Sequence, residues 1–265
     1  MELNLEGKSV IITGGSAGIG LAAAKAFVAE GANVLIIGRD KDRLQEAKAT
    51  LKAARLSDHT SVHTVSADMT EEESIHQAFL QANQLFTSID ILVNNAGAAK
   101  AGSFFEIDDS YFTDAWTLKF LGYVRMVRLV GKEMIQQKSG TIINIVGAAA
   151  RTPSPSFLPG STTNAAIINF TRGIAKELAP HHVTINAISP GYTATERAER
   201  LAGQQADMKN ISVEEAKRAI TDNIPLGEMV RPEEVANMAL LLASGCVRSM
   251  TGTEVIVDGG QQPGI

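Results

Sequence analysis

Short runs of β-branched and apolar residues alternate with longer amphipathic stretches along the chain. Apolar runs of about four to eight residues between turn residues are typical of buried strands, and the longer stretches have helical spacing. The runs predict strands at 9–12, 33–37, 62–67, 89–93, 141–146, 183–188 and 254–257. Strands that alternate with helices predict a single α/β domain over residues 1–265, built on a Rossmann-like, doubly wound parallel sheet.

Helical spacing fills the intervals between these runs. It predicts helices at 19–30, 41–55, 71–86, 110–137, 160–178 and 232–244. At the third of these, Thr70 followed by Glu73 predicts a capping box. Residues 196–221 are polar and helical, and we expect 192–222 to form a helical lid over a substrate.

The first strand runs directly into a glycine-rich loop, Thr13-Gly14-Gly15-Ser16-Ala17-Gly18-Ile19-Gly20. A helix follows at once, so free backbone N–H groups and the positive end of the helix dipole converge on one place. Glycines allow a pyrophosphate to approach the backbone, where a Cβ would block it. The spacing Gly-x-x-x-Gly-x-Gly differs from the common GxGxxG fingerprint. A tight turn that binds nothing is the alternative interpretation.

Composition narrows the class of protein. The chain has 265 residues, of which 45% are hydrophobic and 20% charged, which suits one globular domain with a sizeable core. A net charge of −5 gives no electrostatic case for binding nucleic acid or an acidic membrane. The single Cys246 excludes an internal disulfide and favours a reducing, cytoplasmic setting. No apolar stretch approaches the roughly 18 residues of a membrane helix.

Five motifs in order resemble the short-chain dehydrogenase/reductase family over essentially the whole chain. They are the glycine loop, Asp68, Asn94-Asn95-Ala96-Gly97, and the segments 186–191 and 251–260. The resemblance implies an oxidoreductase that binds a nicotinamide dinucleotide and a small-molecule substrate at the carboxyl edge of the sheet. It also implies a homodimer or homotetramer assembled through the two long central helices and the last strand, the alternative being a monomer in which one of these helices is simply buried.

The resemblance also implies which residues bind the cofactor. Asp68 would contact its adenine end, and Thr195 would hold the nicotinamide carboxamide. Asn94 and Asn95 would support the sheet beside it, or serve only to satisfy backbone groups at a strand end. The predicted cofactor-binding set is Gly14, Ser16, Ala17, Gly18, Ile19, Gly20, Arg39, Asp68, Met69, Asn95, Ala96, Gly97, Pro190, Gly191 and Thr195.

The end of the second strand bears on the choice between NAD and NADP. NAD enzymes of this fold tend to place an acidic residue there, which bonds the ribose 2′-hydroxyl. This chain has Gly38 followed by Arg39. A guanidinium suits bidentate contact with a phosphate, so the pattern favours NADP over NAD. The alternative is a surface arginine that pairs with Asp40 or Asp42.

The catalytic residues of the family do not carry over. Its reaction uses a tyrosine hydroxyl, a lysine four residues later and a serine thirteen residues before the tyrosine. Here those positions hold Gly160, Asn164 and Gly147, and a helix position that usually carries asparagine holds Lys119. The stretch between residues 123 and 192 contains no tyrosine, so a shift of alignment does not restore the set.

Three side chains are candidates for the missing chemistry. Lys119 would bring an ammonium into the cleft and Asn164 an amide, which exchanges the family's residue types between two neighbouring helices. Tyr192 offers a hydroxyl, and a phenol is a better general acid than a serine or threonine. The alternatives are that Lys119 points to solvent and that Tyr192 packs against the lid. We assign no metal ligands.

Three functions therefore stay open. The first is an NADP-linked oxidoreductase with a rearranged acid/base group, acting on a small carbonyl or alcohol. The second is a lyase or isomerase that uses the same cleft. The third is a catalytically inactive nucleotide-binding or assembly subunit.

Overall fold

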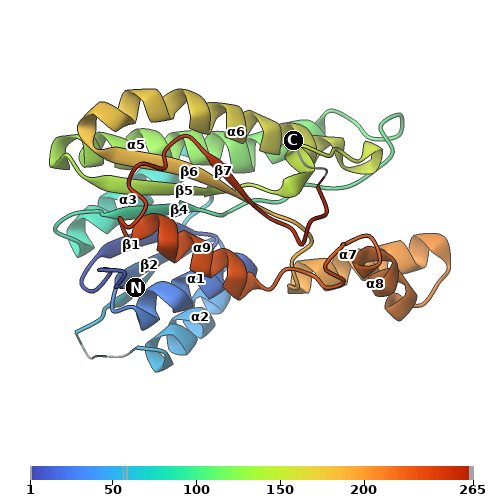
Figure 1. Ribbon diagram of the computed structural model, residues 1–265, viewed down its shortest axis with the longest axis horizontal. Helices are drawn as coiled ribbons and strands as arrows, with labels where there is room; N and C mark the ends of the chain where they lie inside the picture. The colour runs from blue at the N-terminus through green and yellow to red at the C-terminus, as the bar shows by residue number, and fades with distance from the viewer. Residues whose placement is uncertain (1, 56, 58, 263–265) are drawn as a thin grey trace.

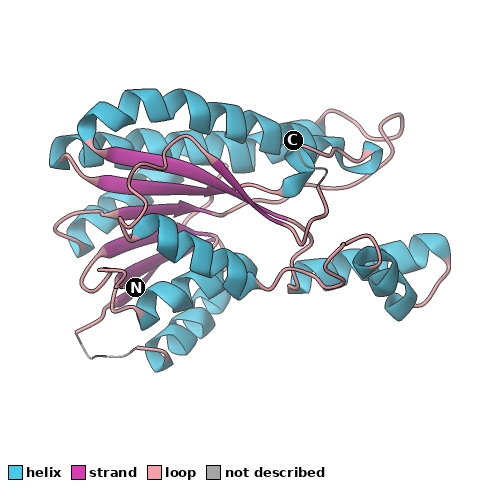
Figure 2. Cartoon of the chain, viewed as in Figure 1, coloured by secondary structure: helices cyan, strands magenta, loops and turns pink. Residues whose placement is uncertain are grey.

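The computed structural model describes residues 2–55, 57 and 59–262. Within these residues the strands form one parallel sheet in the order β3-β2-β1-β4-β5-β6-β7 (Figure 2). The predicted α/β fold with a doubly wound parallel sheet is confirmed. The strands are β1 (Ser9–Thr13), β2 (Asn33–Gly38), β3 (Val62–Ser66), β4 (Ile91–Asn94), β5 (Gly140–Ile145), β6 (Val183–Pro190) and β7 (Glu254–Val257).

Helices cover both faces of this sheet (Figure 1). On one face lie α1 (Gly18–Ala29), α2 (Lys41–Ala53) and α9 (Pro232–Ala243). On the other face lie α3 (Glu72–Leu85), α5 (Gly122–Gln137) and α6 (Leu158–Leu178). The short α4 (Ser110–Ala115) and the π-helix η1 (Trp116–Leu121) lead directly into α5, so the predicted helix at 110–137 contains one wider segment.

The strands read as continuous apolar runs because both of their faces are buried. In β1, Val10 and Ile12 pack into the core beneath α1 and α9. Ile11, between them, packs into the opposite core beneath α3 and α5. All three side chains are fully buried. A one-residue shift of register would exchange the two cores, so this pattern fixes the strand.

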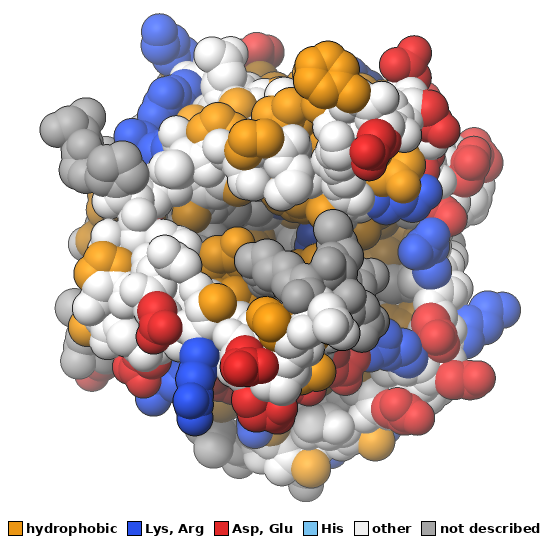
Figure 3. All heavy atoms as spheres, turned by 90° about the vertical axis from the view of Figure 1, so that its right-hand side faces the viewer, with side chains coloured by type: hydrophobic (Ala, Val, Ile, Leu, Met, Phe, Trp, Pro, Cys, Tyr) orange, Lys and Arg blue, Asp and Glu red, His pale blue; other side chains and the backbone are white. Residues whose placement is uncertain are grey.

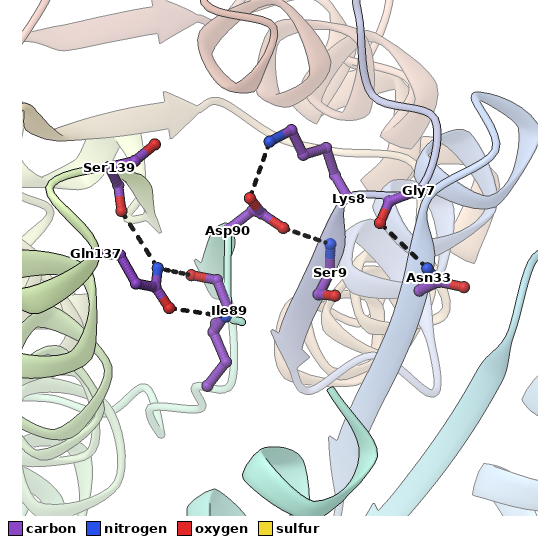
Figure 4. A network of polar contacts seen from close by, with 8 residues as sticks. All are labelled: Gly7, Lys8, Ser9, Asn33, Ile89, Asp90, Gln137 and Ser139. Atoms are coloured by element: carbon purple, nitrogen blue, oxygen red, sulfur yellow. Dashed lines mark hydrogen bonds and ion pairs between the residues drawn. The ribbon is translucent and has the colours of Figure 1, made fainter. Parts of the chain in front are cut away.

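Polar contacts close the amino ends of the central strands, at the edge opposite the candidate site (Figure 4). Asp90 accepts hydrogen bonds from Lys8 Nζ at 2.9 Å and from the backbone N–H of Ser9 at 2.9 Å. The Gln137 side chain brackets the backbone of Ile89, donating to its carbonyl at 3.0 Å and accepting from its N–H at 3.3 Å. These contacts join β1, β4 and α5.

β1 and β4 are neighbours at the centre of the sheet. From β1 the chain continues to β2 on one side, and from β4 it continues to β5 on the other side. Ligands of doubly wound sheets bind at such a switch in strand order. The glycine loop follows β1 and the Asn94-Asn95-Ala96-Gly97 segment follows β4, so both meet at this point. The fold thus places the predicted motifs around one site.

Two local predictions are wrong. The capping box at Thr70 does not form, because α3 begins after Glu71 and the Thr70 hydroxyl donates to Asp68 at 2.8 Å. The polar helix predicted at 196–221 is two helices, α7 (Glu196–Lys209) and α8 (Val213–Thr221). Asn210 adopts a positive φ of 52°, and Ser212 forms a capping box that starts α8.

Figure 1 shows α7 and α8 extending beyond the carboxyl edge of the sheet. None of the helices in the described ranges has the length and apolarity to cross a bilayer.

Candidate active site

The glycine loop has the geometry of an anion site. Gly14 and Gly18 have φ angles of +66° and +53°, which favour glycine. A Cβ on Gly14 would lie 2.9 Å from the Cα of Ala96. The N-cap of α1 is Ala17, which offers no side-chain acceptor, and the first turn carries no acidic residue. The first N–H groups of α1 therefore have no capping side chain, and the loop fits a pyrophosphate.

Asn95 holds this loop against the end of β4. Its Nδ2 donates to the carbonyls of Thr13 at 3.2 Å and Gly14 at 3.0 Å. In return, the Thr13 hydroxyl accepts from the N–H groups of Asn95 at 3.0 Å and Ala96 at 3.1 Å. Asn94 is buried and donates to Asn144 at 3.0 Å. Both asparagines thus satisfy polar groups at strand ends, and Asn95 shapes the loop from behind.

The predicted adenosine end lies beside Gly38. The Ser16 hydroxyl is 3.5 Å from the place that a Cβ on Gly38 would take. The Arg39 guanidinium is 66% exposed and lies 3.8 Å from the Asp68 carboxylate. Asp40 instead caps α2, accepting from the Asp42 N–H at 3.0 Å. Because an exposed ion pair of this length is weak, Arg39 is available to a phosphate.

Asp68 and Met69 follow β3. Burial alone would raise the pKa of Asp68, but hydrogen bonds from the Thr70 N–H and hydroxyl, with the charge of Arg39, lower the pKa below its ordinary value. The carboxylate is thus an anionic acceptor beside the predicted adenine pocket. The Met69 side chain is buried in the core, and its carbonyl oxygen lies 3.2 Å from the Cβ position of Gly122 on α5.

The loop after β6 approaches the glycine loop from the other side. β6 ends at Pro190, and Gly191 packs so closely on Asp258 that a Cβ there would lie 2.9 Å from the Asp258 Cβ. The Thr195 methyl group is 3.4 Å from the place that a Cβ on Gly18 would take. Gly18, predicted to contact the pyrophosphate, and Thr195, predicted to hold the nicotinamide carboxamide, therefore lie next to one another.

Lys119 lies in the π-helix η1, a wide helical turn of a kind that often occurs at functional sites. Its ammonium donates to Asn164 Oδ1 at 2.8 Å and to the carbonyl of Val146. Its alkyl stem passes over Gly97, where a Cβ would lie 2.7 Å from the Lys119 Cδ. The structure thus brings Lys119, Asn164 and Gly97 together at the ends of β4 and β5.

This lysine is a perturbed base. Desolvation, and to a smaller extent the positive charge of Arg197, lowers the pKa of Lys119 from its ordinary value to about 7. An ammonium has three N–H donors, and two of them are used by Asn164 and Val146. The third makes no hydrogen bond within the part of the chain that the structure describes, and the Tyr123 ring centroid lies 6.0 Å from the ammonium nitrogen.

Two more glycines leave room for side chains of this site. Gly147 has a φ of +145°, and a Cβ there would lie 2.8 Å from Asn164 Nδ2. A Cβ on Gly160 would overlap the ring of Phe157. The Asn164 amide and the Phe157 ring therefore fill the space in front of these glycines.

Sequence reasoning missed Phe157, although its position one helical turn before Gly160 is a usable signal. It also missed Arg197, which follows Thr195 by two residues and whose Nη1 lies 3.5 Å from the Gly97 carbonyl oxygen.

Tyr192 makes no hydrogen bond to Lys119. Its side chain is 45% exposed, and its carbonyl accepts from the Val230 N–H at 2.9 Å. Its hydroxyl makes no hydrogen bond with the described residues. Figure 3 looks onto the face at the carboxyl edge of the sheet, where apolar side chains gather toward the middle and most charged ones lie toward the margin.

Comparison with known proteins is consistent with this geometry. The family described as "short chain dehydrogenase" matches residues 8–206. The chain therefore belongs to the short-chain dehydrogenase family.

Relatives and solved structures match over nearly the full chain. A 3-oxoacyl-[acyl-carrier-protein] reductase from Aquifex aeolicus is 35% identical, over 98% of this chain and 99% of the relative. L-sorbose reductase from Gluconobacter frateurii, solved with NADPH and L-sorbose, is 29% identical, with a TM-score of 0.94 and all of both chains covered. An NAD⁺-bound xylitol dehydrogenase is 25% identical, with a TM-score of 0.91 over 97% of this chain and 100% of its own.

The glycine loop gives a first prediction. Gly18→Val places a branched side chain where a pyrophosphate must approach, so dinucleotide binding measured by calorimetry should be lost. Gly7→Val is the matched control, because Gly7 also has a positive φ of +72° but nothing within 4 Å of its Cβ position. Circular dichroism should show both variants folded. Normal binding by Gly18→Val would mean that the loop is only a turn.

The packing of Phe157 on Gly160 gives a second prediction. Gly160→Tyr should destabilise the fold by about 1–3 kcal/mol, because the new side chain must displace the Phe157 ring. Adding Phe157→Ala should recover part of this loss, so urea unfolding of both single variants and the double variant should show a favourable coupling. Additive free-energy changes would show that the two side chains do not compete for one space.

Proposed function

We propose that this protein binds NADP(H) and reduces a small carbonyl compound, with Lys119 as the proton donor in place of the family's tyrosine. The observation that carries the proposal is the ammonium of Lys119 at the carboxyl edge of the sheet, 2.8 Å from Asn164 Oδ1, with one N–H left for a substrate oxygen. Two of the similar proteins are a 3-oxoacyl-[acyl-carrier-protein] reductase and an L-sorbose reductase, which supports reduction of a carbonyl group.

Two features favour the 2′-phosphorylated cofactor. Gly38 offers no carboxylate to a ribose 2′-hydroxyl, while Arg39 follows it in the chain and the Ser16 hydroxyl lies 3.5 Å from its Cβ position. Arg39 can bind a phosphate with two parallel hydrogen bonds. Similar proteins with NADPH and with NAD⁺ both match this chain, so the matches do not distinguish the two cofactors. The residues at 16, 38 and 39 are what favours NADP.

The dinucleotide, when bound, supplies the hydride that is added to the carbonyl carbon. The protein must then supply a proton to the carbonyl oxygen, and Lys119 is the group placed to do so. Asn164 and Val146 hold the ammonium by accepting two of its hydrogens, which leaves the third for a substrate oxygen. Transfer leaves a neutral amine, and a pKa of about 7 allows it to be protonated again from water near neutral pH.

The positions of the family's serine and tyrosine, Gly147 and Gly160, take no part in proton transfer in this proposal. Gly147 and Gly160 carry no hydroxyl, so no side chain there polarises the carbonyl. The close packing of Lys119 on Gly97, of Asn164 on Gly147 and of Phe157 on Gly160 supports a rebuilt site. Tyr192 stays outside the proposed proton path, because its exposed hydroxyl has no contact that would orient it.

We further propose that α7 and α8 form the lid predicted at 192–222. They share a small apolar cluster of their own, made of Ala202, Ala206, Ala216 and Ile220. An ion pair of 2.6 Å between Arg43 and Glu196 joins the start of α7 to α2, so the base of the lid is anchored near the glycine loop.

We also propose a homodimer or homotetramer that uses the face of η1 and α6. Trp116 and Leu121 are both 37% exposed there, which is high for such large apolar side chains. Phe120 stacks edge-on between Trp116 and Phe170 at centroid distances of 5.1 and 6.3 Å, so an aromatic strip crosses from η1 to α6.

Arg39 gives a third prediction. Arg39→Ala should weaken NADPH binding by about tenfold or more while leaving NADH binding nearly unchanged, since only NADPH carries the 2′-phosphate. Isothermal titration with both cofactors measures this. Arg128→Ala, an exposed arginine on α5, removes the same charge far from the site and should alter neither affinity. Equal weakening of both cofactors would contradict the assignment.

Lys119 gives a fourth prediction. Lys119→Met should slow hydride transfer in single-turnover experiments by about 10²–10⁴-fold, the usual contribution of a positioned acid. The NADPH affinity should stay nearly intact. In the parent, the rate of reduction should fall as the pH rises through about 7, because only the ammonium donates a proton. The Met variant should lack this dependence.

Lys132→Met, at an exposed lysine on α5, and Tyr192→Phe are the controls, and both should react like the parent. An unchanged rate in Lys119→Met would show that another group is the acid. Binding of NADPH without turnover on aldehydes, ketones and quinones would favour the nucleotide-binding subunit.

A further inference from the structure

Two cationic side chains approach the same residue of the candidate site. The Lys119 stem lies over Gly97, and the Arg197 Nη1 lies 3.5 Å from the Gly97 carbonyl oxygen. They come from separate elements, η1 and the first turn of α7, so the fold itself brings them together. Their mutual repulsion contributes to the lowered pKa of Lys119.

Neither cation has a carboxylate partner among the residues that the structure describes. Glu196, next to Arg197 in the chain, instead lies 2.6 Å from Arg43 and 3.9 Å from Arg200. Asp114, on the helix that leads to Lys119, pairs with Lys100 at 3.5 Å. Glu196 and Asp114 thus pair with other basic residues, and the basic groups of Lys119 and Arg197 have no acidic partner at the site.

Two unpaired like charges destabilise one another unless an anion joins them. The bond to Gly97 is long and uses one of the five N–H donors of Arg197, which leaves the planar fork of the guanidinium open. Such a fork binds carboxylates and phosphates with two parallel hydrogen bonds. Arg197 follows Thr195, the residue that faces Gly18, and its guanidinium reaches Gly97, where the Lys119 stem also lies.

We propose that the substrate is an anionic carbonyl compound, whose carboxylate or phosphate is bound by Arg197 while its carbonyl oxygen meets Lys119. This inference rests on the proposed function for the role of Lys119, but it concerns binding and can be tested without turnover. The binding of such an anion would also favour the protonated form of Lys119, because it brings a negative charge close to the ammonium. Arg197 is then a specificity-determining residue of the site.

The experiment compares charged carbonyl compounds with matched neutral ones. The pairs are 3-oxobutanoate with its methyl ester, 2-oxo-3-phenylpropanoate with its methyl ester, and dihydroxyacetone phosphate with dihydroxyacetone. Each is titrated by calorimetry into the protein saturated with NADP⁺, which has no hydride to transfer, and is assayed separately for NADPH oxidation. The anionic member of at least one pair should bind about tenfold or more tightly than its neutral partner. The pair that shows the difference tells carboxylate from phosphate.

Arg197→Met should remove this difference, and Arg197→Lys should retain part of it, because a lysine keeps the charge and loses the fork. Arg218→Met is the matched control, since Arg218 is an exposed arginine on the neighbouring α8, and it should leave the difference unchanged. The NADPH affinity of Arg197→Met should equal that of the parent.

Equal binding of charged and neutral compounds by the parent would overturn the inference. So would a loss of NADPH affinity in Arg197→Met with the charged-to-neutral ratio intact, because Arg197 would then bind the cofactor pyrophosphate. Tight binding of the anion without NADPH oxidation would support the inference while the proposed reduction failed. The two ideas therefore fail separately.

Discussion

An ammonium removed from bulk water needs hydrogen-bond acceptors, and this need at Lys119 organises the site. The Asn164 amide and the Val146 carbonyl supply two acceptors. Gly97 leaves room for the lysine stem and Gly147 for the amide. A side chain added at either glycine would displace a partner of the charge, so the residue types at these positions depend on one another.

Mutual dependence of this kind separates a rebuilt site from a decayed one. In a decayed site, the loss of one catalytic group leaves the others without constraint. Here the lysine donor on η1 meets the asparagine acceptor on α6 at 2.8 Å. The ring of Phe157 fills the space in front of Gly160. The candidate site thus combines a positioned basic group with an apolar wall.

The cofactor side of the cleft follows a different logic, because backbone groups form most of it. The glycine loop offers N–H groups of α1 that no side chain caps, and Asn95 holds the loop from behind through two carbonyls. These contacts do not involve Lys119. Chemistry at the nicotinamide end can therefore change without loss of the pyrophosphate site, which is how one fold serves several reactions.

The sequence alone determined the sheet, the glycine loop and the order of motifs, because strand patterning and glycine spacing are local signals. It also led to the prediction that Lys119 and Asn164 take part in the chemistry of the site. It could not show that Lys119 turns toward Asn164, that Phe157 lies on Gly160, or that Arg197 reaches Gly97. It also placed the α3 cap wrongly, because Thr70 bonds to Asp68. Such contacts join segments far apart in the chain, or depend on competition between partners, so only the tertiary structure decided them.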